Sequence, residues 1–461
     1  MFRIFAVAKN TFTSAMRMKT AIVFMLILIV LLPLLSINTT GDGTAKGRLQ
    51  SFISYGLGLT SLLLSLLTII VSCYCLCGEI KGKQIYMVLT KPLRRWEMIL
   101  GKLFGVIMLN LLLLVVFSSV IFLLTIQMPK TSRAGAISEE EKIVLQNEFF
   151  TARKALSITF KDDEINAAAE KQYDELAKSG QLDEGQTKYE VIKELRRSER
   201  FARLSAAPGG VAMWEFENVQ IADASENIYV KFKYNASKTP ADKQIVGTWY
   251  IGDYRQIKYG QTGQVQTPIY TVPTKNVVET AHEIFVPADA VASDGYLAVA
   301  FHNEASNGTT VIFPKEDGIK VLYKAGTFGG NYLRATIIVA SQLIFLSVLG
   351  VWLSTWLSFP VAILFSLTVF FIGATNNFVL SSFSTVGKNI GLIYQIVMMP
   401  LLWLLPKFDG KFSVTKYMVN AEMIDYGFLS ASLLMLLAKA AILTVLAMLI
   451  FRKREIAKIT V

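Results

Sequence analysis

Long apolar runs, interrupted by polar stretches, are the dominant pattern along the chain. Six of them approach or exceed the roughly 20 residues that an α-helix needs to cross the hydrocarbon core of a bilayer. The runs are Thr20–Ile37, Phe52–Cys77, Met98–Ile126, Tyr332–Trp356, Phe359–Asn377 and Gly427–Phe451. In hydrocarbon the backbone N–H and C=O groups must be paired within their own segment, so these runs predict helices. We therefore expect a polytopic α-helical membrane protein with about six transmembrane helices.

A polar segment, residues 129–330, divides these runs into two groups of three. Its first part, residues 138–206, is charged and rich in helix-favouring residues, with breaks at Gly180 and Gly185. Its second part, residues 211–329, alternates apolar and polar positions between turn signals, which is typical of short antiparallel strands. The segment therefore predicts an α+β domain that combines a helical hairpin with an antiparallel β-sandwich.

The chain is accordingly expected to have three parts, with membrane helices in residues 1–128 and 331–461 on either side of the polar domain. Residues 2–18 have an apolar face at helical spacing, which predicts an interfacial helix or a plain extension of the first span. The apolar stretch 390–405 is short and contains Pro400. It predicts a re-entrant segment, with a seventh span as the alternative.

Charge is distributed unevenly between the polar domain and the rest of the chain. The whole chain carries a formal net charge of +11. Residues 129–330 contain 24 basic and 28 acidic residues, a net charge of −4, whereas the remainder carries +15. This asymmetry excludes a uniformly basic nucleic-acid-binding protein and is typical of a chain whose parts lie on opposite sides of a membrane.

Three basic clusters set the expected orientation in the membrane. They lie at the N-terminus, in the loop after the second apolar run and in the C-terminal tail. Short loops rich in Lys and Arg stay cytoplasmic, and an even number of spans places both termini on the same side. We therefore expect a multi-pass protein of the plasma (inner) membrane with cytoplasmic termini and an extracytoplasmic domain at residues 129–330.

Residue types that carry catalysis or bind metals are sparse. The three cysteines, Cys73, Cys75 and Cys77, end the second apolar run at a spacing that does not converge ligands on one helix face. They are interpreted as small apolar residues of a membrane helix, with acylation as the main alternative. His282 and His302 lie in predicted strands and belong to no metal-ligand cluster of carboxylates or cysteines. The sequence therefore predicts no metal site and no catalytic residue.

The most specific stretch is the loop between the second and third runs, residues 79–102 (EIKGKQIYMVLTKPLRRWEMILGK). It contains an apolar patch, a helix-ending Pro92 and the charges of Arg94 and Arg95. An amphipathic segment at the cytoplasmic end of a helix bundle is suited to docking into a partner's groove. A simple helix hairpin whose charges set the topology explains the same residues equally well.

This loop resembles the coupling-helix region of ABC-2 type transporter permeases. An acidic residue, a hydrophobic run, a small residue, Pro, Arg and Gly-Lys follow one another in the family's order. The matching positions are Glu79, Ile85, Leu89, Thr90, Pro92, Arg95, Gly101 and Lys102. Pro406–Asp409 and Ile450–Ile456 are similar to family segments as well. The resemblance covers the membrane portion of the chain and leaves out the polar domain.

The resemblance implies the permease subunit of an ABC-2 type export complex. It implies a second permease chain, identical or different, and cytoplasmic ABC ATPase subunits that dock on the coupling loop, residues 78–97. The expected coupling residues are Glu79, Ile85, Leu89, Pro92, Arg94, Arg95 and Lys102. The chain lacks a GxxxxGK[ST] phosphate loop, so ATP and Mg²⁺ are expected in the partner ATPase and this chain is not expected to be an enzyme.

A second hypothesis is a non-transporting membrane receptor or scaffold whose β-sandwich binds a cell-surface ligand. Aromatic residues of the predicted strands, Trp214, Trp249, Tyr250 and Tyr254, serve either the domain core or such a ligand site. Export and the simple movement of the outer domain by ATP hydrolysis are equally compatible with the first hypothesis.

Two polar residues inside the apolar runs are further candidates for an intramembrane site. Lys439 lies near the middle of the last run, where a charge is costly unless it snorkels, pairs or faces water. It snorkels, reflects a shifted helix boundary, or marks a dimer interface or a translocation path. Asn110 lies in the third run, where its amide can hydrogen-bond a neighbouring helix.

Overall fold

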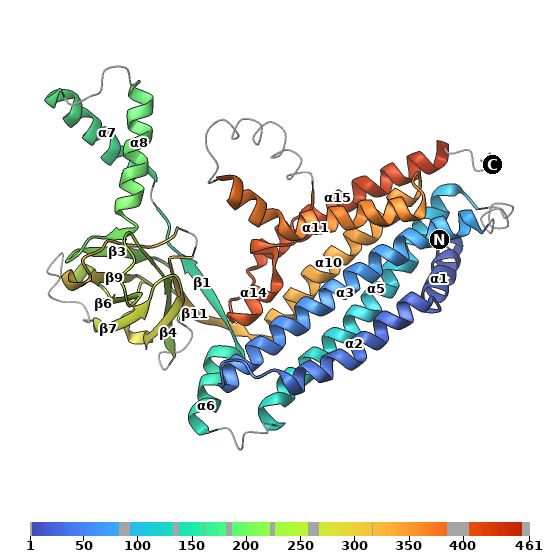
Figure 1. Ribbon diagram of the computed structural model, residues 1–461, viewed down its shortest axis with the longest axis horizontal. Coiled ribbons are helices and arrows are strands. Elements are labelled where there is room, and N and C mark those ends of the chain that lie inside the picture. Colours follow the sequence, from blue (N-terminus) through green and yellow to red (C-terminus); the bar gives the residue numbers. More distant parts are fainter. Residues whose placement is uncertain are drawn as a thin grey trace. The chain divides into compact units, whose positions relative to one another are not determined.

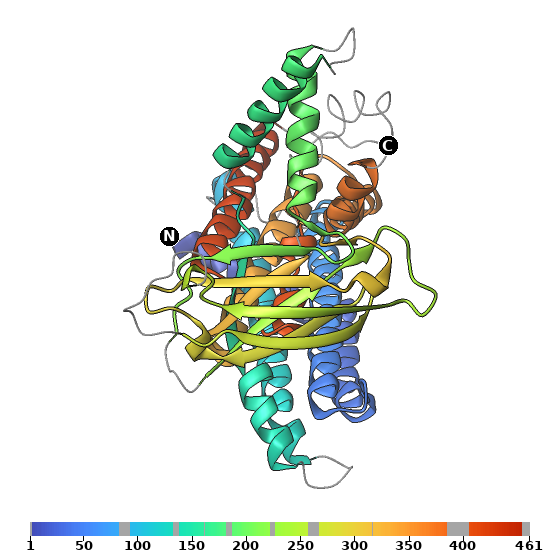
Figure 2. The ribbon, with the colours of Figure 1, turned by 90° about the vertical axis from the view of Figure 1, so that its left-hand side faces the viewer.

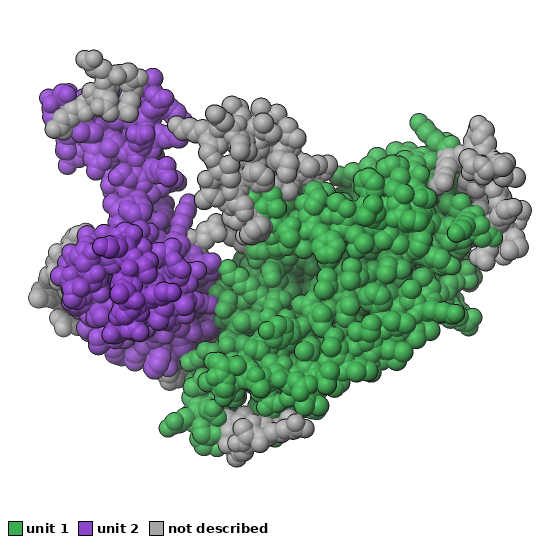
Figure 3. Space-filling view, in the orientation of Figure 1, with its two compact units in different colours: residues 1–152, 327–461 green, residues 153–326 purple. Residues whose placement is uncertain are grey.

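The computed structural model describes most of the chain. The described residues are 2–82, 93–131, 138–160, 162–180, 187–221, 226–256, 267–315, 317–384 and 405–453. The chain divides into two compact units, one of residues 1–152 and 327–461 and the other of residues 153–326 (Figure 3). We call the first the helical unit and the second the β-rich unit.

The helical unit contains, among the described residues, six helices that are long and apolar enough to cross a membrane (Figure 1). They are α2 (Lys19–Asn38), α3 (Ala45–Lys81), α5 (Arg95–Gln127), α10 (Phe328–Ser354), α11 (Phe359–Ser384) and α15 (Tyr426–Lys453). Each predicted apolar run lies within one of them, except that the fourth run extends two residues beyond α10. The prediction of six apolar helices beside a separate β-rich domain is confirmed.

The helices α3 and α10 form the centre of the helical unit. In an 18-residue apolar stretch of α10, 72% is buried inside the unit, compared with 17% in the corresponding stretches of α2 and α15. The two central helices approach closely at Gly350, where an added Cβ would lie 1.9 Å from Oγ of Ser72. Small residues permit such packing between apolar helices, and the apolar faces left exposed on α2 and α15 are suited to lipid contact.

A further helix, α1 (Phe2–Met16), packs beside the beginning of α5. A Cβ added to Gly101 would lie 2.6 Å from Cβ of Val7, and one added to Gly105 would lie 2.7 Å from Cβ of Thr11. Both contacts advance by four residues on each helix, so α1 and α5 run in the same direction. The helix predicted at the N-terminus is confirmed, and its position at a membrane interface stays a prediction.

The predicted re-entrant stretch, residues 390–405, lies outside the described residues except for its last position. The choice between a re-entrant segment and a seventh span therefore stays open. Shorter described helices complete the helical unit: η1 (Met128–Thr131), α6 (Glu139–Val144), η2 (Leu145–Phe149), η6 (Gly410–Phe412) and α14 (Val414–Val419).

The segment that leads into α15 is tied to α10 by one amide side chain. Asn331 donates from Nδ2 to the carbonyl oxygen of Glu422 at 2.8 Å and accepts at Oδ1 from the N–H of Ile424 at 2.8 Å. The amide of Gln50 on α3 likewise donates to the carbonyl oxygen of Val419 at 2.7 Å. These bonds satisfy backbone groups of an irregular segment that would otherwise be costly to bury.

The β-rich unit contains the predicted helical hairpin, formed by α7 (Asp162–Ser179) and α8 (Lys188–Ala202). Thr187 caps α8, and its hydroxyl accepts from the N–H of Glu190. Two ion pairs fasten the base of the hairpin, Arg200 to Asp162 at 2.7 Å and Arg203 to Glu164 at 3.4 Å.

Residues 138–206 are not helical throughout, which corrects part of the prediction. Between η2 and α7 the chain forms a strand, β1 (Thr151–Ser157), which lies beside β11 (Ile319–Thr327) in a sheet. Local propensity favours a helix for much of β1, but strand formation depends more on neighbouring strands than on the isolated sequence. The pairing with β11 therefore overrides the local preference.

Two four-stranded sheets form the sandwich, with strand orders β1-β11-β4-β8 and β3-β9-β6-β7 (Figure 2). A small third sheet has the order β2-β10-β5. The remaining strands are β2 (Ser205–Ala206), β3 (Val211–Phe216), β4 (Asn227–Lys233), β5 (Asn235–Ala236), β6 (Gln244–Gly252), β7 (Tyr270–Val277), β8 (Ala281–Pro287), β9 (Leu297–Asn303) and β10 (Val311–Ile312). The pairings recorded among them are antiparallel, as predicted.

Aromatic side chains fill the core between the two large sheets. Trp249 and Phe232, one from each sheet, have ring centroids 4.4 Å apart, and Phe301 lies 4.8 Å from Trp249. Trp214 is also buried, whereas Tyr250 and Tyr254 are each 38% exposed. The two tryptophans thus serve the core, which is one of the two roles considered for the aromatic residues.

Candidate functional site

The structure describes four of the seven predicted coupling residues. Glu79 lies in the last turn of α3, Arg94 precedes α5, and Arg95 and Lys102 lie in the first turns of α5. The other three, Ile85, Leu89 and Pro92, lie in residues 83–92, outside the described residues. The geometry therefore concerns the two ends of the predicted coupling loop.

Lys102 and Glu79 join these two ends directly. The Nζ atom of Lys102 lies 2.6 Å from Oε1 of Glu79 and donates to the carbonyl oxygen of Cys75 at 2.8 Å. Lys102 is only 2% exposed, while Glu79 is 24% exposed. An ammonium group is expensive to bury unless a counter-ion and further acceptors surround it, so this pair fixes α5 against α3.

Arg95 connects the loop to the last helix of the unit. Its Nη1 donates to the carbonyl oxygen of Phe451 at 3.3 Å and to that of Arg452 at 2.9 Å. These carbonyl groups belong to the last described turn of α15, which the structure describes as far as Lys453. The guanidinium therefore ties the start of α5 to this turn through two charge-assisted hydrogen bonds.

Arg94 has a different environment from its neighbour. Its backbone N–H donates to Oε2 of Glu97 at 2.8 Å, which places a carboxylate at the positive N-terminal end of α5. The Arg94 side chain is exposed. Of the described coupling residues, Arg94 is thus the one available to an external partner, whereas Lys102 and Arg95 hold helices together.

Asn110 lies deeper in the bundle, on the side of α5 that faces α10. It is 1% exposed, and its Nδ2 donates to Oγ of Ser347 at 2.9 Å. The Oδ1 atom is buried and has no hydrogen-bond partner among the described residues. An unpaired amide oxygen in an apolar interior is costly. Asn110 therefore places an unsatisfied hydrogen-bond acceptor inside the helix bundle, which a residue that serves packing alone would not do.

Lys439 is half-buried on α15 and donates from Nζ to the carbonyl oxygen of Leu405 at 3.0 Å. The bond directs the ammonium toward the segment that follows the undescribed residues, and it is not simple snorkelling along α15. Lys439 therefore anchors Leu405 to the middle of the last helix.

No group of three or more His, Cys, Asp or Glu residues that could hold a metal occurs in the part of the chain that the structure describes. Cys77 donates to backbone carbonyl oxygens near the end of α10, for example that of Leu357 at 3.5 Å. His282 contacts the carbonyl oxygen of Val277 through Nε2 at 2.8 Å. These contacts are packing and turn contacts.

One contributor to the site was missed at the level of sequence. The contact of α1 with α5 at Gly101 and Gly105 brackets Lys102, so α1 covers the helix next to the buried ion pair. The signal was present as the spacing Gly-x-x-x-Gly, which lets two helices approach closely.

The fold and these contacts define a class: a multi-pass helical membrane protein with a separate β-rich domain. No family model matches the chain, and no curated protein matches it either. A more specific function rests on the arrangement of the residues themselves.

Proposed function

We propose that the chain is the transmembrane permease subunit of an ABC-2 type export complex. A separate cytoplasmic ATPase would hydrolyse ATP with Mg²⁺, and this chain would convert that cycle into export of a substrate or movement of its outer domain. The observation that carries the proposal is the buried Lys102–Glu79 pair at the two ends of residues 79–102, the stretch that contains most of the predicted coupling loop. The resemblance of residues 79–102 to the coupling region of such permeases supplies the family.

The physical argument is one of mechanical connection. A docking segment transmits a partner's movement only if its ends are fixed to the helices that must move. The Lys102–Glu79 pair fixes the loop to α3 and α5, and Arg95 fixes it to α15. A displacement of the loop would therefore be transmitted to the three apolar helices α3, α5 and α15.

The proposal extends to partners and location. The chain pairs with a second permease chain in the plasma (inner) membrane, its termini and coupling loop lie in the cytoplasm, and residues 129–330 are extracytoplasmic. The charge difference between this segment and the rest of the chain supports this orientation.

The test uses the full chain co-expressed with candidate ATPase subunits. We expect an ATPase to co-purify with the tagged chain and its activity to respond to the permease. Arg94→Glu alters an exposed side chain and should weaken ATPase association several-fold without disturbing the helices. Lys9→Glu, an equivalent charge reversal at an exposed position on α1, is the control and should leave association unchanged.

The anchor is tested separately by Arg95→Glu. The ATPase should still bind this variant, but its hydrolysis should become independent of the permease, because the connection to α15 is lost. If no ATPase associates and Arg95→Glu changes nothing, the coupling role is wrong. Function that survives disruption of the loop but is lost on deletion of residues 138–330 would instead favour the receptor or scaffold hypothesis.

A further inference from the structure

Strand β3 has one open edge. It is the first strand in the order β3-β9-β6-β7, and among the described residues it pairs with β9 alone. The carbonyl oxygen of Gly210 accepts from the N–H of Asn303, so Gly210 and Asn303 form a hydrogen-bonded pair. Because such pairs recur at every second residue of an antiparallel ladder, the next ones are Ala212 with Phe301, Trp214 with Val299 and Phe216 with Leu297.

The alternation of an antiparallel ladder then fixes where the other backbone groups of β3 point. The N–H and C=O groups of Val211, Met213 and Glu215 face away from β9. Three successive outward-facing residues offer a template for one additional strand.

The other three outer strands of the sandwich carry residues that discourage such pairing. Lys154 lies in β1, Pro273 and Lys275 lie in β7, and Pro287 ends β8. Lysine and proline are the usual means by which sheet edges avoid unwanted partners. Strand β3, with the sequence VAMWEF, has neither residue. Its edge therefore lacks the protection given to the other edges of the same domain.

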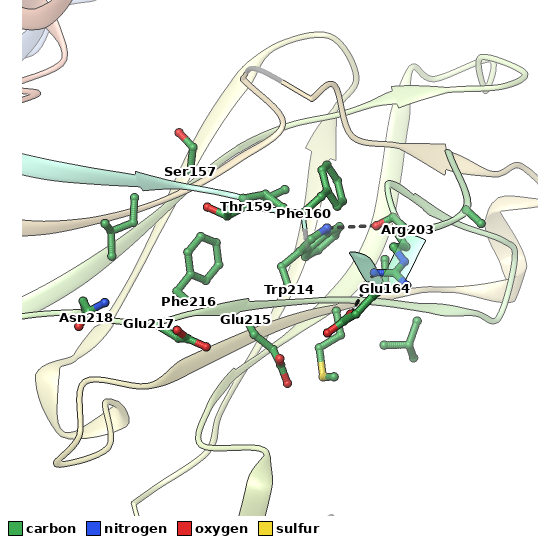
Figure 4. Close-up of a pocket in the computed structure, with 16 residues that line it drawn as sticks. Ser157, Thr159, Phe160, Glu164, Arg203, Trp214, Glu215, Phe216, Glu217 and Asn218 are labelled. Atoms are coloured by element: carbon green, nitrogen blue, oxygen red, sulfur yellow. Dashed lines mark hydrogen bonds and ion pairs between the residues drawn. The ribbon is translucent and has the colours of Figure 1, made fainter. Parts of the chain in front are cut away.

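A groove of about 640 Å³ runs along this open edge. One wall is the segment 156–160, which comprises the end of β1 and the three residues after it and contributes the apolar side chains of Leu156, Ile158 and Phe160. The other wall is β3. Figure 4 shows Thr159 and Phe160 lying over Trp214, while Glu215 projects from the opposite side of the strand.

The groove is acidic on its solvent side. Of the described lining residues, Glu164, Glu215 and Glu217 carry carboxylates and Arg203 carries the one guanidinium. Arg203 is already paired with Glu164 at 3.4 Å and with Glu199 at 3.3 Å.

The two carboxylates of the open edge are free to receive cations. Glu215 is held in place by the hydroxyl of Tyr296, which donates to its Oε1 at 2.8 Å. Glu217 is exposed. Within the part of the chain that the structure describes, neither Glu215 nor Glu217 forms an ion pair.

We propose that this edge binds an extended, cationic peptide segment of a partner protein, which adds a fifth strand beside β3. Backbone hydrogen bonds to Val211, Met213 and Glu215 would give affinity. Alternate side chains of the peptide would meet two surfaces: lysine or arginine at Glu215 and Glu217, and aliphatic residues along Trp214 and the wall formed by residues 156–160. A second copy of β3 fits poorly because it would bring like charges together. The proposal goes beyond the export function and does not depend on it.

The probe is a fluorescein-labelled nine-residue peptide in which lysine and valine alternate. Its binding to the full chain in detergent is measured by fluorescence anisotropy. We expect saturable binding that is lost when glutamate replaces lysine in the peptide. Two further peptides, N-methylated on one or the other set of alternate amides, should differ sharply, because only one set of amides faces β3.

Two variants test the location. Met213→Pro removes an outward-facing N–H and should weaken binding about tenfold or more, while leaving the bonds between β3 and β9 in place. Thr271→Pro makes the same change at an outward-facing position of β7, a strand that already contains Pro273, and should have no effect. Glu217→Lys should weaken binding of the lysine peptide and improve binding of the glutamate peptide.

Several results would overturn the proposal. Unchanged binding to Met213→Pro, or equal binding of the two N-methylated peptides, would exclude strand addition at β3. Equal weakening by Met213→Pro and Thr271→Pro would show a general effect on the fold rather than a site. If the chain self-associates, fails to bind the peptide, and dissociates on Met213→Pro, the occupant is a second copy.

Discussion

The ammonium of Lys102 lies 2.6 Å from the carboxylate of Glu79, and the two members of this pair are unequally buried. Lys102 is enclosed between helices, whereas Glu79 keeps a quarter of its side chain exposed. Removing one partner is therefore not equivalent to removing the other, because the cost depends on which charge is left behind.

Glu79→Ala should destabilise the helical unit more than Lys102→Met. The first change leaves a buried ammonium with the Cys75 carbonyl as a neutral acceptor, and we expect a loss of about 2–3 kcal/mol. The second leaves the carboxylate of Glu79, whose Oε2 atom is buried but whose side chain is 24% exposed near the end of α3 and can turn toward water. Thermal unfolding in detergent measures both, and the double variant should recover much of the loss. A double variant less stable than Glu79→Ala would contradict this account.

Arg95→Ala should loosen the last described turn of α15. The carbonyl groups of Phe451 and Arg452 lose a charged donor, which is worth about 1 kcal/mol. Amide hydrogen exchange in residues 448–453 should accelerate about fivefold. Arg94→Ala, which alters the exposed neighbour, is the matched control and should leave this exchange unchanged. Equal acceleration in both variants would indicate a general effect on the start of α5.

Gly105→Ala should separate α1 from α5. The added methyl group would lie 2.6 Å from the carbonyl oxygen of Ala8, so the helices must move apart at a cost of about 1–3 kcal/mol. Faster tryptic cleavage after Lys9 reports the loss of packing. Gly58→Ala is the control, because its Cβ would meet no atom within 4 Å. Unchanged cleavage in Gly105→Ala would show that α1 does not depend on this contact.

The β-rich unit should lose stability in acid partly through Asp294. Arg255 donates from Nη1 to Asp294 at 2.7 Å, and this bond lowers the pKa of Asp294 from its ordinary value of 3.8. A carboxyl group with a lowered pKa stabilises the fold above pH 3.8, and the contribution disappears as the pH falls through the folded value. Arg255→Gln should therefore flatten the decline of the thermal midpoint below pH 4, measured by tryptophan fluorescence. An identical decline in both proteins would contradict this role of Asp294.

The apolar frame and the strands could be predicted because their signals are local. A run such as Met98–Ile126 would be very unusual in the core of a soluble protein, and the alternation in Val211–Phe216 reappears as alternating exposure along β3. The strand at Thr151–Ser157 could not be predicted, because its pairing partner lies about 170 residues away in sequence and its own residues favour a helix.

The candidate site was predictable in its composition but not in its contacts. The residues Glu79, Arg95 and Lys102 were identified by type and order. Nothing local distinguishes Arg95, which binds two backbone carbonyl groups of α15, from Arg94, which faces outward. That distinction depends on how helices far apart in sequence pack together. The pattern of residues in one sequence does not show which helices come into contact.

The contact between Arg95 and the end of α15 has a consequence for the order of events during synthesis. It joins positions 356 and 357 residues apart, so α5 must enter the membrane long before its capping partners exist. Until α15 is synthesised, the guanidinium of Arg95 lacks these two carbonyl acceptors. Formation of these two hydrogen bonds is therefore among the last steps of assembly, and a chain truncated before α15 would leave α5 without this connection to the last helix.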